Sequence, residues 1–185
     1  MIRKEVRLTD GRVLLRHFRS DDATTVYEAV RESVAELSPW MPWCHPDYTP
    51  EESKAWVVTR RVAQARGEDY EFAIVSARDG FFLGGCGLSR LEAANKTTSL
   101  GYWVRTSRTK QGIATAAALL LVKFGFEELA LNRIEIMVDV ANKASQRVAE
   151  KLGAVKEGIL RKRHIVHDEA RDVFLYSIVR GDFPT

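Results

Sequence analysis

A basic loop that contains a glycine carries the most recognisable chemistry in the sequence. This loop, Arg105–Thr115, follows an apolar stretch, and Gly112 and Ala114 stand where the next helix is expected to begin. The free N–H groups and dipole of a helix N-terminus attract anions, and small residues let an anion approach the backbone. With mobile positive charge from Arg105, Arg108 and Lys110, the loop is predicted to bind a phosphate or pyrophosphate. The alternative is a helix start whose glycine only permits the turn.

Other glycine patterns point away from nucleotide chemistry. The sequence contains no Gly-x-x-x-x-Gly-Lys-Ser/Thr motif. Gly85-Cys86-Gly87 lies inside a predicted strand and opens no helix, so it favours a tight contact between strands over a dinucleotide site. Nucleotide hydrolysis and dinucleotide binding therefore both lose support.

The composition is that of an ordinary globular chain. The 185 residues include 28 Lys and Arg against 25 Asp and Glu, a formal net charge of +3. This small excess argues against a dedicated nucleic-acid-binding protein, which usually carries a strong basic stripe. No apolar run reaches the roughly 20 residues of a membrane span, and no secretory signal is recognised. We therefore expect a cytoplasmic protein without a membrane partner, in which Cys44 and Cys86 are free thiols.

The elements that must position the loop follow from periodicity. Strands are expected at 12–18, 70–76, 81–88, 97–104, 134–138, 155–163 and 172–179. Helices are expected from Ser20 onward, near 31–37, from Thr49-Pro50 to Arg66, at 111–129 and at 142–152. In the helix that ends near Arg66, one side is expected to be apolar: Ala55, Val58, Val62 and Ala65.

This order predicts one α/β (α+β) domain over residues 1–185. Its core would be a mixed, mostly antiparallel sheet of about seven strands, with helices on both faces. The strand at 97–104, the helix at 111–129 and the strand at 134–138 form one βαβ unit. Its two strands should be parallel neighbours with a right-handed crossover.

Several of these segments resemble the GNAT superfamily of N-acetyltransferases, and within it the RimJ/RimL-type branch. The family's acetyl-CoA loop reads Gln/Arg-x-x-Gly-x-Gly/Ala, and the corresponding segment here is 109–114, with Thr109 at the first position. The segment Gly-Tyr-Trp-Val at 101–104 is typical of the branch, as are Asn-Lys-Ala-Ser at 142–145 and Glu-Lys-Leu-Gly at 150–153. The order of elements fits over nearly the whole chain. The resemblance implies a GNAT-like fold, acetyl-CoA as cofactor and a primary amine as acceptor.

The resemblance also implies the cofactor contacts. The pantetheine arm would pair with the end of the strand at 103–105, where a backbone N–H would stabilise the thioester oxyanion. The expected cofactor-binding residues are Trp103, Val104, Arg105, Arg108, Thr109, Lys110, Gln111, Gly112, Ile113, Ala114, Thr115, Asn142 and Ser145.

The group that protonates the leaving thiolate departs from the common pattern. Many relatives place a tyrosine two helical turns after the Asn142 position, where this chain has Ala149. In the RimL-like pattern Ser145 faces the cofactor sulfur, so it is expected to stabilise the thiolate and relay a proton. The alternative is a polar residue that only joins Asn142 in capping a helix.

Two acids are candidates for the catalytic base. An α-amine has a pKa of about 8, against about 10.4 for lysine, so an α-amine needs only a weak base. Glu71 and Glu92 are the catalytic candidates, acting through water, and solvated surface acids are the alternative. The branch often has an acid just before Gly-Tyr-Trp, but this chain has Ser99-Leu100 there.

Aromatic residues are candidates for the acceptor site. Trp40 and Trp43 either cap the core or form one wall of an acceptor groove. Tyr102 and Trp103 alternate on their strand, so one should face the core and the other the cleft. Trp40, Trp43 and Tyr102 are the expected substrate-binding residues.

The histidines predict no metal site. His164 and His167 would lie on opposite sides of a strand end, which is poor geometry for a shared ligand. His17 and His45 show no evident partner in the sequence.

The predicted function is an acetyl-CoA-dependent N-acetyltransferase that works by direct transfer in a ternary complex. The expected acceptor is the N-terminal α-amine of a protein or peptide. The alternatives are a small-molecule amine (an antibiotic, a polyamine or an amino acid) and a non-catalytic acyl-CoA-binding sensor. A homodimer is left open.

Overall fold

A computed structural model describes residues 6–66 and 70–182. Within this part of the chain, eight strands form a single sheet in the order β1-β2-β3-β4-β5-β6-β8-β7. The strands are β1 (Arg7–Thr9), β2 (Val13–His17), β3 (Tyr70–Ser76), β4 (Phe82–Glu92), β5 (Thr97–Val104), β6 (Arg133–Asp139), β7 (Val155–Val166) and β8 (Glu169–Val179). The helices are α1 (Asp22–Glu32), α2 (Val34–Leu37), α3 (Pro50–Arg66), the 3₁₀ turn η1 (Thr106–Arg108), α4 (Ile113–Glu127) and α5 (Lys143–Lys151).

The sheet is mixed, as predicted. β5 and β6 are parallel neighbours on either side of α4, and the other neighbouring strands pair antiparallel. The expected strand count was one too low, because the first strand is preceded by the short β1. A turn at Asp10 separates the two: its carboxylate accepts the backbone N–H groups of Arg12 and Val13, both at 2.9 Å. Gly11 provides the left-handed φ of +87° that this turn requires.

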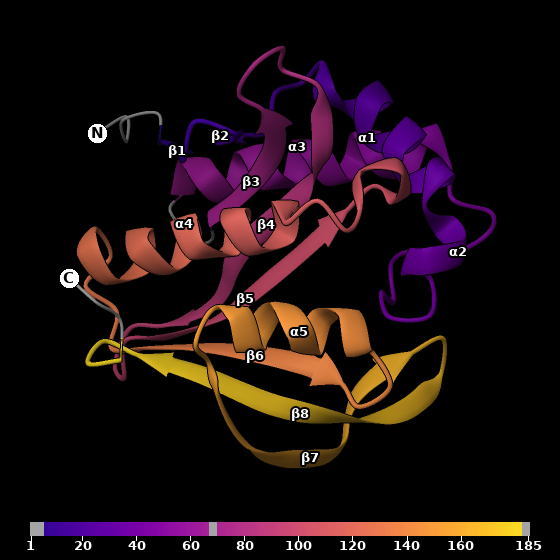
Figure 1. The fold of residues 1–185 in the computed structure, drawn as a ribbon. Helices are drawn as coiled ribbons and strands as arrows, with labels where there is room; N and C mark the ends of the chain where they lie inside the picture. Colours follow the sequence, from indigo (N-terminus) through magenta and orange to yellow (C-terminus); the bar gives the residue numbers. More distant parts are fainter. Residues whose placement is uncertain (1–5, 67–69, 183–185) are drawn as a thin grey trace.

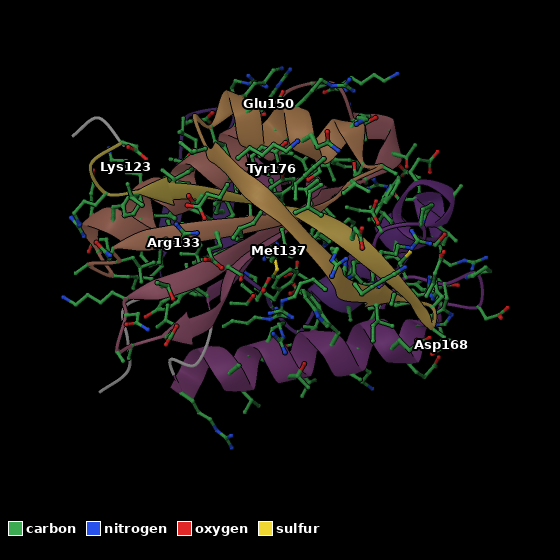
Figure 2. The ribbon with its side chains drawn as sticks, turned by 90° about the horizontal axis from the view of Figure 1, so that it is seen from below. Lys123, Arg133, Met137, Glu150, Asp168 and Tyr176 are labelled. Carbon is green, nitrogen blue, oxygen red and sulfur yellow. The ribbon has the colours of Figure 1, made fainter. Side chains whose placement is uncertain are left out.

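Helices cover both faces of the sheet, and each face has its own hydrophobic cluster. Side chains that alternate along β3 belong to one cluster or the other. Phe72 and Ile74 pack into a cluster with α4 and α5, whereas Ala73 and Val75 pack into a second cluster with α1 and α3. Figure 1 shows α4 and α5 in front of the sheet and α3 behind it. Figure 2, turned by 90°, shows α5, which carries Glu150, and the long helix α3 on opposite sides of the sheet.

The expected apolar side of α3 is wrong. Val58 and Val62 are 52% and 46% exposed, whereas Ser53 and Val57 face the core. A serine can occupy this buried position because its hydroxyl donates to the Tyr48 hydroxyl at 3.1 Å. The side chain of Ala65, also placed on that side, lies outside the described residues. None of the described helices has the length and apolar character needed to cross a membrane.

The central structural feature for function is the point where β5 and β6 separate. The two strands pair only over Thr97–Ser99 and Arg133–Glu135. From Leu100 onward β5 has no β6 partner, and Figure 1 shows the strands diverging beside the starts of α4 and α5. The divergence leaves one edge of β5 open between the two faces of the sheet.

Candidate functional site

The start of α4 has the open backbone that the expected anion cradle requires. Gly112 is its N-cap in a left-handed conformation, with φ of +75°, and no side chain of the described residues caps this helix. A Cβ added at Gly112 would meet only the Arg12 guanidinium, 4.0 Å away, so the backbone is open to an approaching group. The first N–H groups of α4 therefore suit a pyrophosphate.

The side chains around the cradle differ in how far they are exposed. Arg108, Lys110 and Gln111 are exposed beside it, as are Thr109 and Gly112. Ile113 is buried in the core, so only its backbone can serve the cradle. The small Ala114 and Thr115 follow in the first turn and are half-buried.

Arg105 is not the mobile cation that was expected. Its guanidinium binds Glu32 of α1, with the Nε group 2.9 Å from Oε2, and stacks over Phe81 at 4.7 Å. The hydrogen bond from Arg105 is the largest cause that lowers the pKa of Glu32 to about 2. Glu32 also accepts the Ser107 N–H at 2.8 Å, and Ser33 accepts the Thr106 N–H at 2.9 Å. Arg105 therefore attaches the basic loop Arg105–Thr115 to α1.

Ser145 lies at the start of α5 and bonds to β5. The Asn142 side chain caps α5 by accepting the Ser145 N–H at 3.0 Å. The Ser145 hydroxyl is 2.9 Å from the Tyr102 hydroxyl, which is also 3.2 Å from the Ser145 carbonyl oxygen. Burial raises the pKa of Tyr102 to about 12, so the phenol is neutral at ordinary pH. Ala149 is fully buried and cannot replace either hydroxyl.

Alternation along β5 places its two aromatic residues on opposite faces, as predicted. Tyr102 points to α5, whereas Trp103 packs against Phe82 and Trp43 on the α1 and α3 face. The phenol hydroxyl of Tyr102 thus lies on the α5 side of the sheet. The ring nevertheless contributes to the wall described next.

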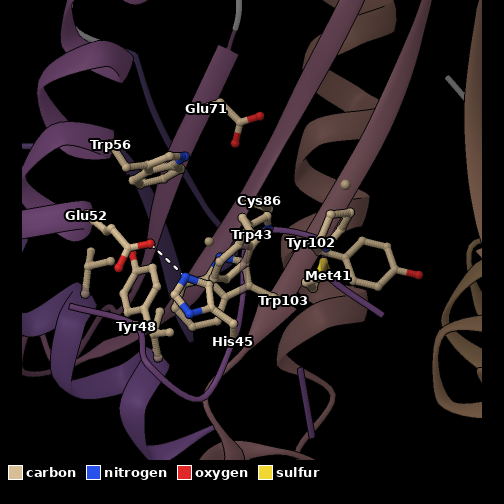
Figure 3. Close-up of a pocket in the computed structure, with 15 residues that line it drawn as sticks. Met41, Trp43, His45, Tyr48, Glu52, Trp56, Glu71, Cys86, Tyr102 and Trp103 are labelled. Atoms are coloured by element: carbon tan, nitrogen blue, oxygen red, sulfur yellow. Dashed lines mark hydrogen bonds and ion pairs between the residues drawn. The ribbon is translucent and has the colours of Figure 1, made fainter. Parts of the chain in front are cut away.

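A cavity of about 600 Å³ opens on the α1 and α3 face beside the β5 edge. Its lining residues come from α1, the segment before α3, α3 itself and the strands β3, β4 and β5: Val26, Val30, Met41, Pro42, Trp43, His45, Tyr48, Glu52, Trp56, Glu71, Gly85, Cys86, Gly101, Tyr102 and Trp103. Figure 3 shows Glu52 and Trp56 on the α3 side and Tyr102 on the β5 side. Trp43 forms part of the cavity wall, whereas the other role expected for it was to cap the core. Trp40 does not appear among the described lining residues.

Two glycines of β4 leave room for neighbouring side chains, and one of them, Gly85, lines the cavity. A Cβ at Gly85 would lie 2.7 Å from the Trp103 indole nitrogen, and one at Gly87 would lie 2.3 Å from the Glu71 carboxylate carbon. Real Cβ atoms do not approach this closely, so only glycine leaves room for these side chains. The predicted tight strand contact at Gly85-Cys86-Gly87 is thereby confirmed, and Glu71 is held against the sheet.

A histidine that seemed isolated in the sequence has a carboxylate partner. Thr49 and Glu52 form a capping box at the start of α3: Thr49 Oγ1 accepts the Glu52 N–H at 3.3 Å, and Glu52 Oε2 accepts the Thr49 N–H at 2.8 Å. Glu52 Oε1 is 2.8 Å from His45 Nε2. The hydrogen bond from His45 is the largest cause that lowers the pKa of Glu52. The capping pattern was visible in the sequence, but the partner of its acid was not.

The two acids proposed as bases lie in different places. Glu71 lines the cavity. Glu92 ends β4 and is exposed, with its carboxylate accepting from Asn95 at 2.7 Å and from Thr97 at 3.2 Å. Because Thr97 begins β5, Glu92 lies at the end of that strand where β5 and β6 still pair. The structure therefore brings Glu71, but not Glu92, to the cavity.

Comparisons with known proteins agree with this geometry. The family profile described as an acetyltransferase (GNAT) domain matches residues 12–155. YdaF of Bacillus subtilis is 34% identical over 105 residues, which are 57% of this chain and 57% of YdaF. The ribosomal-protein-serine acetyltransferase of Escherichia coli is 27% identical over 152 residues, 82% of this chain and 84% of the relative. The structure of Mycobacterium smegmatis RimJ in complex with CoA-disulfide has a TM-score of 0.85 at 27% identity, covering 98% of this chain and 89% of that one.

Proposed function

The chain belongs to the GNAT acetyltransferase family, and we propose that it transfers an acetyl group from acetyl-CoA directly to the N-terminal α-amine of a protein or peptide. One observation carries this proposal. The β5 segment Gly101–Trp103 lines the aromatic cavity on one face of the sheet, while Tyr102 contacts Ser145 on the other. A thioester and an amine that approach from opposite faces can meet at this open strand edge.

The cofactor side has the parts that acyl transfer requires. The cradle at Gly112 suits the pyrophosphate, and the unpaired edge of β5 suits the amide-rich pantetheine arm. Acetyl-CoA supplies a thioester carbonyl carbon, to which the amine nitrogen bonds while the carbon–sulfur bond breaks and its electron pair leaves on sulfur. A backbone N–H at this edge would lower the barrier by about 3 kcal/mol through its bond to the carbonyl oxygen. The Arg105 N–H is not that donor, because it is already bonded to the Leu83 carbonyl at 2.9 Å.

Ser145 and Tyr102 together serve the leaving thiolate. A neutral phenol has one proton to donate, and the acceptors within reach of Tyr102 are the two oxygens of Ser145. With the phenol as donor, the Ser145 hydroxyl keeps its own proton available for the sulfur. Ser145 thus donates to the thiolate, and Tyr102 orients Ser145. The chain in this way supplies from a strand the phenol that many relatives carry at the Ala149 position.

Glu71 is the better of the two candidate bases. It lies in the cavity where an acceptor amine would bind, and an α-amine with a pKa of about 8 needs only a weak base or a water held by a carboxylate. The proton released by the amine would pass through such a water to solvent. Glu92, which lies outside the cavity, is not assigned this role.

A peptide acceptor is supported by the name of the Escherichia coli relative, a ribosomal-protein-serine acetyltransferase. A small-molecule amine is the second candidate, because a cavity of about 600 Å³ also has the size of many small-ligand sites. A sensor without turnover is less well supported. The missing tyrosine at the Ala149 position suggested it, but the Tyr102 phenol lies beside Ser145 instead.

Thiol release tests the proposal. The protein is incubated with acetyl-CoA and either N-terminal peptides or a panel of amine antibiotics, polyamines and amino acids. Peptide-dependent release of CoA is expected. No release with any amine, although the protein binds acetyl-CoA, would overturn the enzyme assignment, and much faster turnover of a small amine would overturn the peptide assignment.

A further inference from the structure

Arg171, near the start of β8, contacts two parts of the chain that are distant in sequence. Its Nη1 group donates to the Pro39 carbonyl at 2.6 Å and lies 3.8 Å from Asp139 Oδ2. Its Nε and Nη2 groups both donate to Glu169 Oε2, at 3.1 and 2.7 Å, so the guanidinium has a defined orientation. Arg171 therefore joins the segment that follows α2 to the end of β6.

The Pro39 contact supports one wall of the aromatic cavity. Trp43, which lines the cavity, lies four residues after Pro39. The turn of the β7–β8 hairpin makes a second contact with this segment, because His167 Nε2 is 3.1 Å from the Ser38 carbonyl oxygen. Figure 1 shows this end of the hairpin below α2. The hairpin thus holds residues 38–43, which we call the wall segment.

The Asp139 contact reaches the turn that leads into α5. Asp139 Oδ1 accepts the Ala141 N–H at 2.8 Å, and the Asp139 carbonyl accepts the Asn142 N–H at 2.9 Å. Asn142 in turn caps α5 by accepting the Ser145 N–H. Because the Asp139 side chain is only 7% exposed, the positive charge of Arg171 offsets the cost of burying its carboxylate. Arg171 thus also stabilises the place where α5 begins.

From these contacts we propose that Arg171 is a positioning residue, which holds the wall segment of the acceptor cavity in register with the start of α5. This inference rests on the proposed function, in which the amine binds beside the wall segment and Ser145 meets the leaving thiolate. The amine nitrogen and the thioester carbon react from about 3 to 3.5 Å apart, and a misplacement of about 1 Å costs about a hundredfold in rate.

An arginine suits this role better than a lysine. A guanidinium carries five N–H donors in one rigid fork, so it can serve three acceptors at once. An ammonium on a flexible stem is a point charge and cannot hold the same acceptors in a fixed geometry. Arg171 acts on the reaction through the two segments that it joins.

The test measures acetylation of a peptide with an N-terminal phenylalanine by Arg171→Lys. Lysine keeps a positive charge near Asp139 but loses the fork, so kcat/KM for the peptide is expected to fall about tenfold. The KM for acetyl-CoA and the Tm are expected to stay close to the wild-type values, because the cradle at Gly112 and the core are untouched. A wild-type kcat/KM for the peptide would overturn the proposal.

A matched control is Arg163→Lys, the same substitution at an exposed residue of β7 in the same hairpin. Its kcat/KM for the peptide should equal that of the wild type. An equal fall in both variants would assign the effect to the loss of any arginine from the hairpin, rather than to the contacts of Arg171, and would overturn the proposal.

A double-mutant cycle with Trp43→Ala separates positioning from a general loss of stability. Trp43 is 40% exposed, so its removal leaves the core intact. If Arg171 acts through the wall segment, Arg171→Lys should lower kcat/KM much less in the Trp43→Ala background than in the wild type. Additive losses would refute this route.

Glu169→Ala keeps the proposal falsifiable if Arg171→Lys folds poorly. The Glu169 side chain is 68% exposed and orients the guanidinium, so its removal is expected to lower kcat/KM about threefold, the order that an exposed ion pair is worth. An unchanged value would contradict the role of Arg171. Absence of thiol release from the wild type with every amine would instead contradict the proposed function, so the two failures are distinguishable.

Discussion

At the scale of single residues, the Tyr102 phenol determines what Ser145 can do. Its burial keeps it neutral, and both of its hydrogen-bond partners among the described residues belong to Ser145. The family resemblance implied a role for Ser145, and the sequence offered the cap by Asn142 as the alternative. The sequence could not predict the phenol partner, because Tyr102 and Ser145 are 43 residues apart and meet only where β5 separates from β6.

Removing either hydroxyl should slow the chemical step. Tyr102→Phe is expected to lower kcat about tenfold and Ser145→Ala ten- to a hundredfold, with the KM for acetyl-CoA little changed. The double variant should be no slower than Ser145→Ala, because Tyr102 acts through Ser145. Steady-state kinetics check this, with Tyr27→Phe on α1 as the control. Additive losses in the double variant would refute the coupling.

A methyl group added at Gly87 should lower activity with little effect on stability. In Gly87→Ala the added Cβ overlaps the end of a flexible side chain, so the Glu71 carboxylate is displaced while the strand stays in place. We expect the free energy of unfolding to change by less than about 1 kcal/mol and kcat/KM to fall about tenfold or more. Gly158→Ala in β7, where a Cβ meets nothing within 4 Å, is the control for thermal unfolding and activity. An unaltered kcat/KM in Gly87→Ala would show that Glu71 has no role in the reaction.

At the scale of elements, α1 holds the start of the basic loop Arg105–Thr115 in place. Glu32 accepts from Arg105 and from the Ser107 N–H, so the start of the loop is fixed before any anion binds. The sequence showed only the basic side of this arrangement. Arg105 looked mobile because its partner lies 73 residues earlier and reaches it through the packing of α1 on the sheet.

The ion pair between Glu32 and Arg105 should make the stability of the protein depend on pH. The pKa of Glu32 falls from an ordinary 4.5 to about 2 on folding, so its contribution is complete above pH 4.5 and is lost as the pH drops towards 2. Glu32→Gln should cost about 1 to 2 kcal/mol near neutral pH, with the Glu32 side chain 28% exposed and partly screened by solvent.

Thermal unfolding from neutral pH down to acid measures this contribution. The difference in Tm between wild type and Glu32→Gln should shrink across the acid range, whereas Glu28→Gln on the exposed side of α1 should match the wild type throughout. A difference that stays constant with pH would contradict the assignment. Weaker CoA binding by Glu32→Gln is also expected.

At the scale of the whole molecule, the Tyr102–Ser145 contact and the aromatic cavity lie on opposite faces of one sheet. The cavity also contains no activated nucleophile among its described residues: the Cys86 thiol is buried, and its raised pKa keeps it protonated. We therefore expect direct transfer in a ternary complex. Initial-rate plots against acetyl-CoA and amine should intersect, and mass spectrometry should find no acetylated protein after incubation with acetyl-CoA alone. Parallel plots together with an acetylated residue would contradict direct transfer.

The sequence predicted this architecture better than its details. The parallel pair, the order of elements and the helices on both faces could be read from periodicity, because each depends on a continuous apolar pattern. Strand β1 is only three residues long and gives no such pattern. The buried side of α3 was missed because Ser53 enters the core through its bond to Tyr48, while Val58 and Val62 remain exposed.

Acetyl transfer to an α-amine is tested most directly by locating the acetyl group on a peptide that carries both an N-terminal phenylalanine and an internal lysine. Tandem mass spectrometry after incubation with acetyl-CoA should find the label on the α-amine, with one CoA thiol released for each acetylated peptide. Label on the lysine, or no label although acetyl-CoA is bound, would contradict the account.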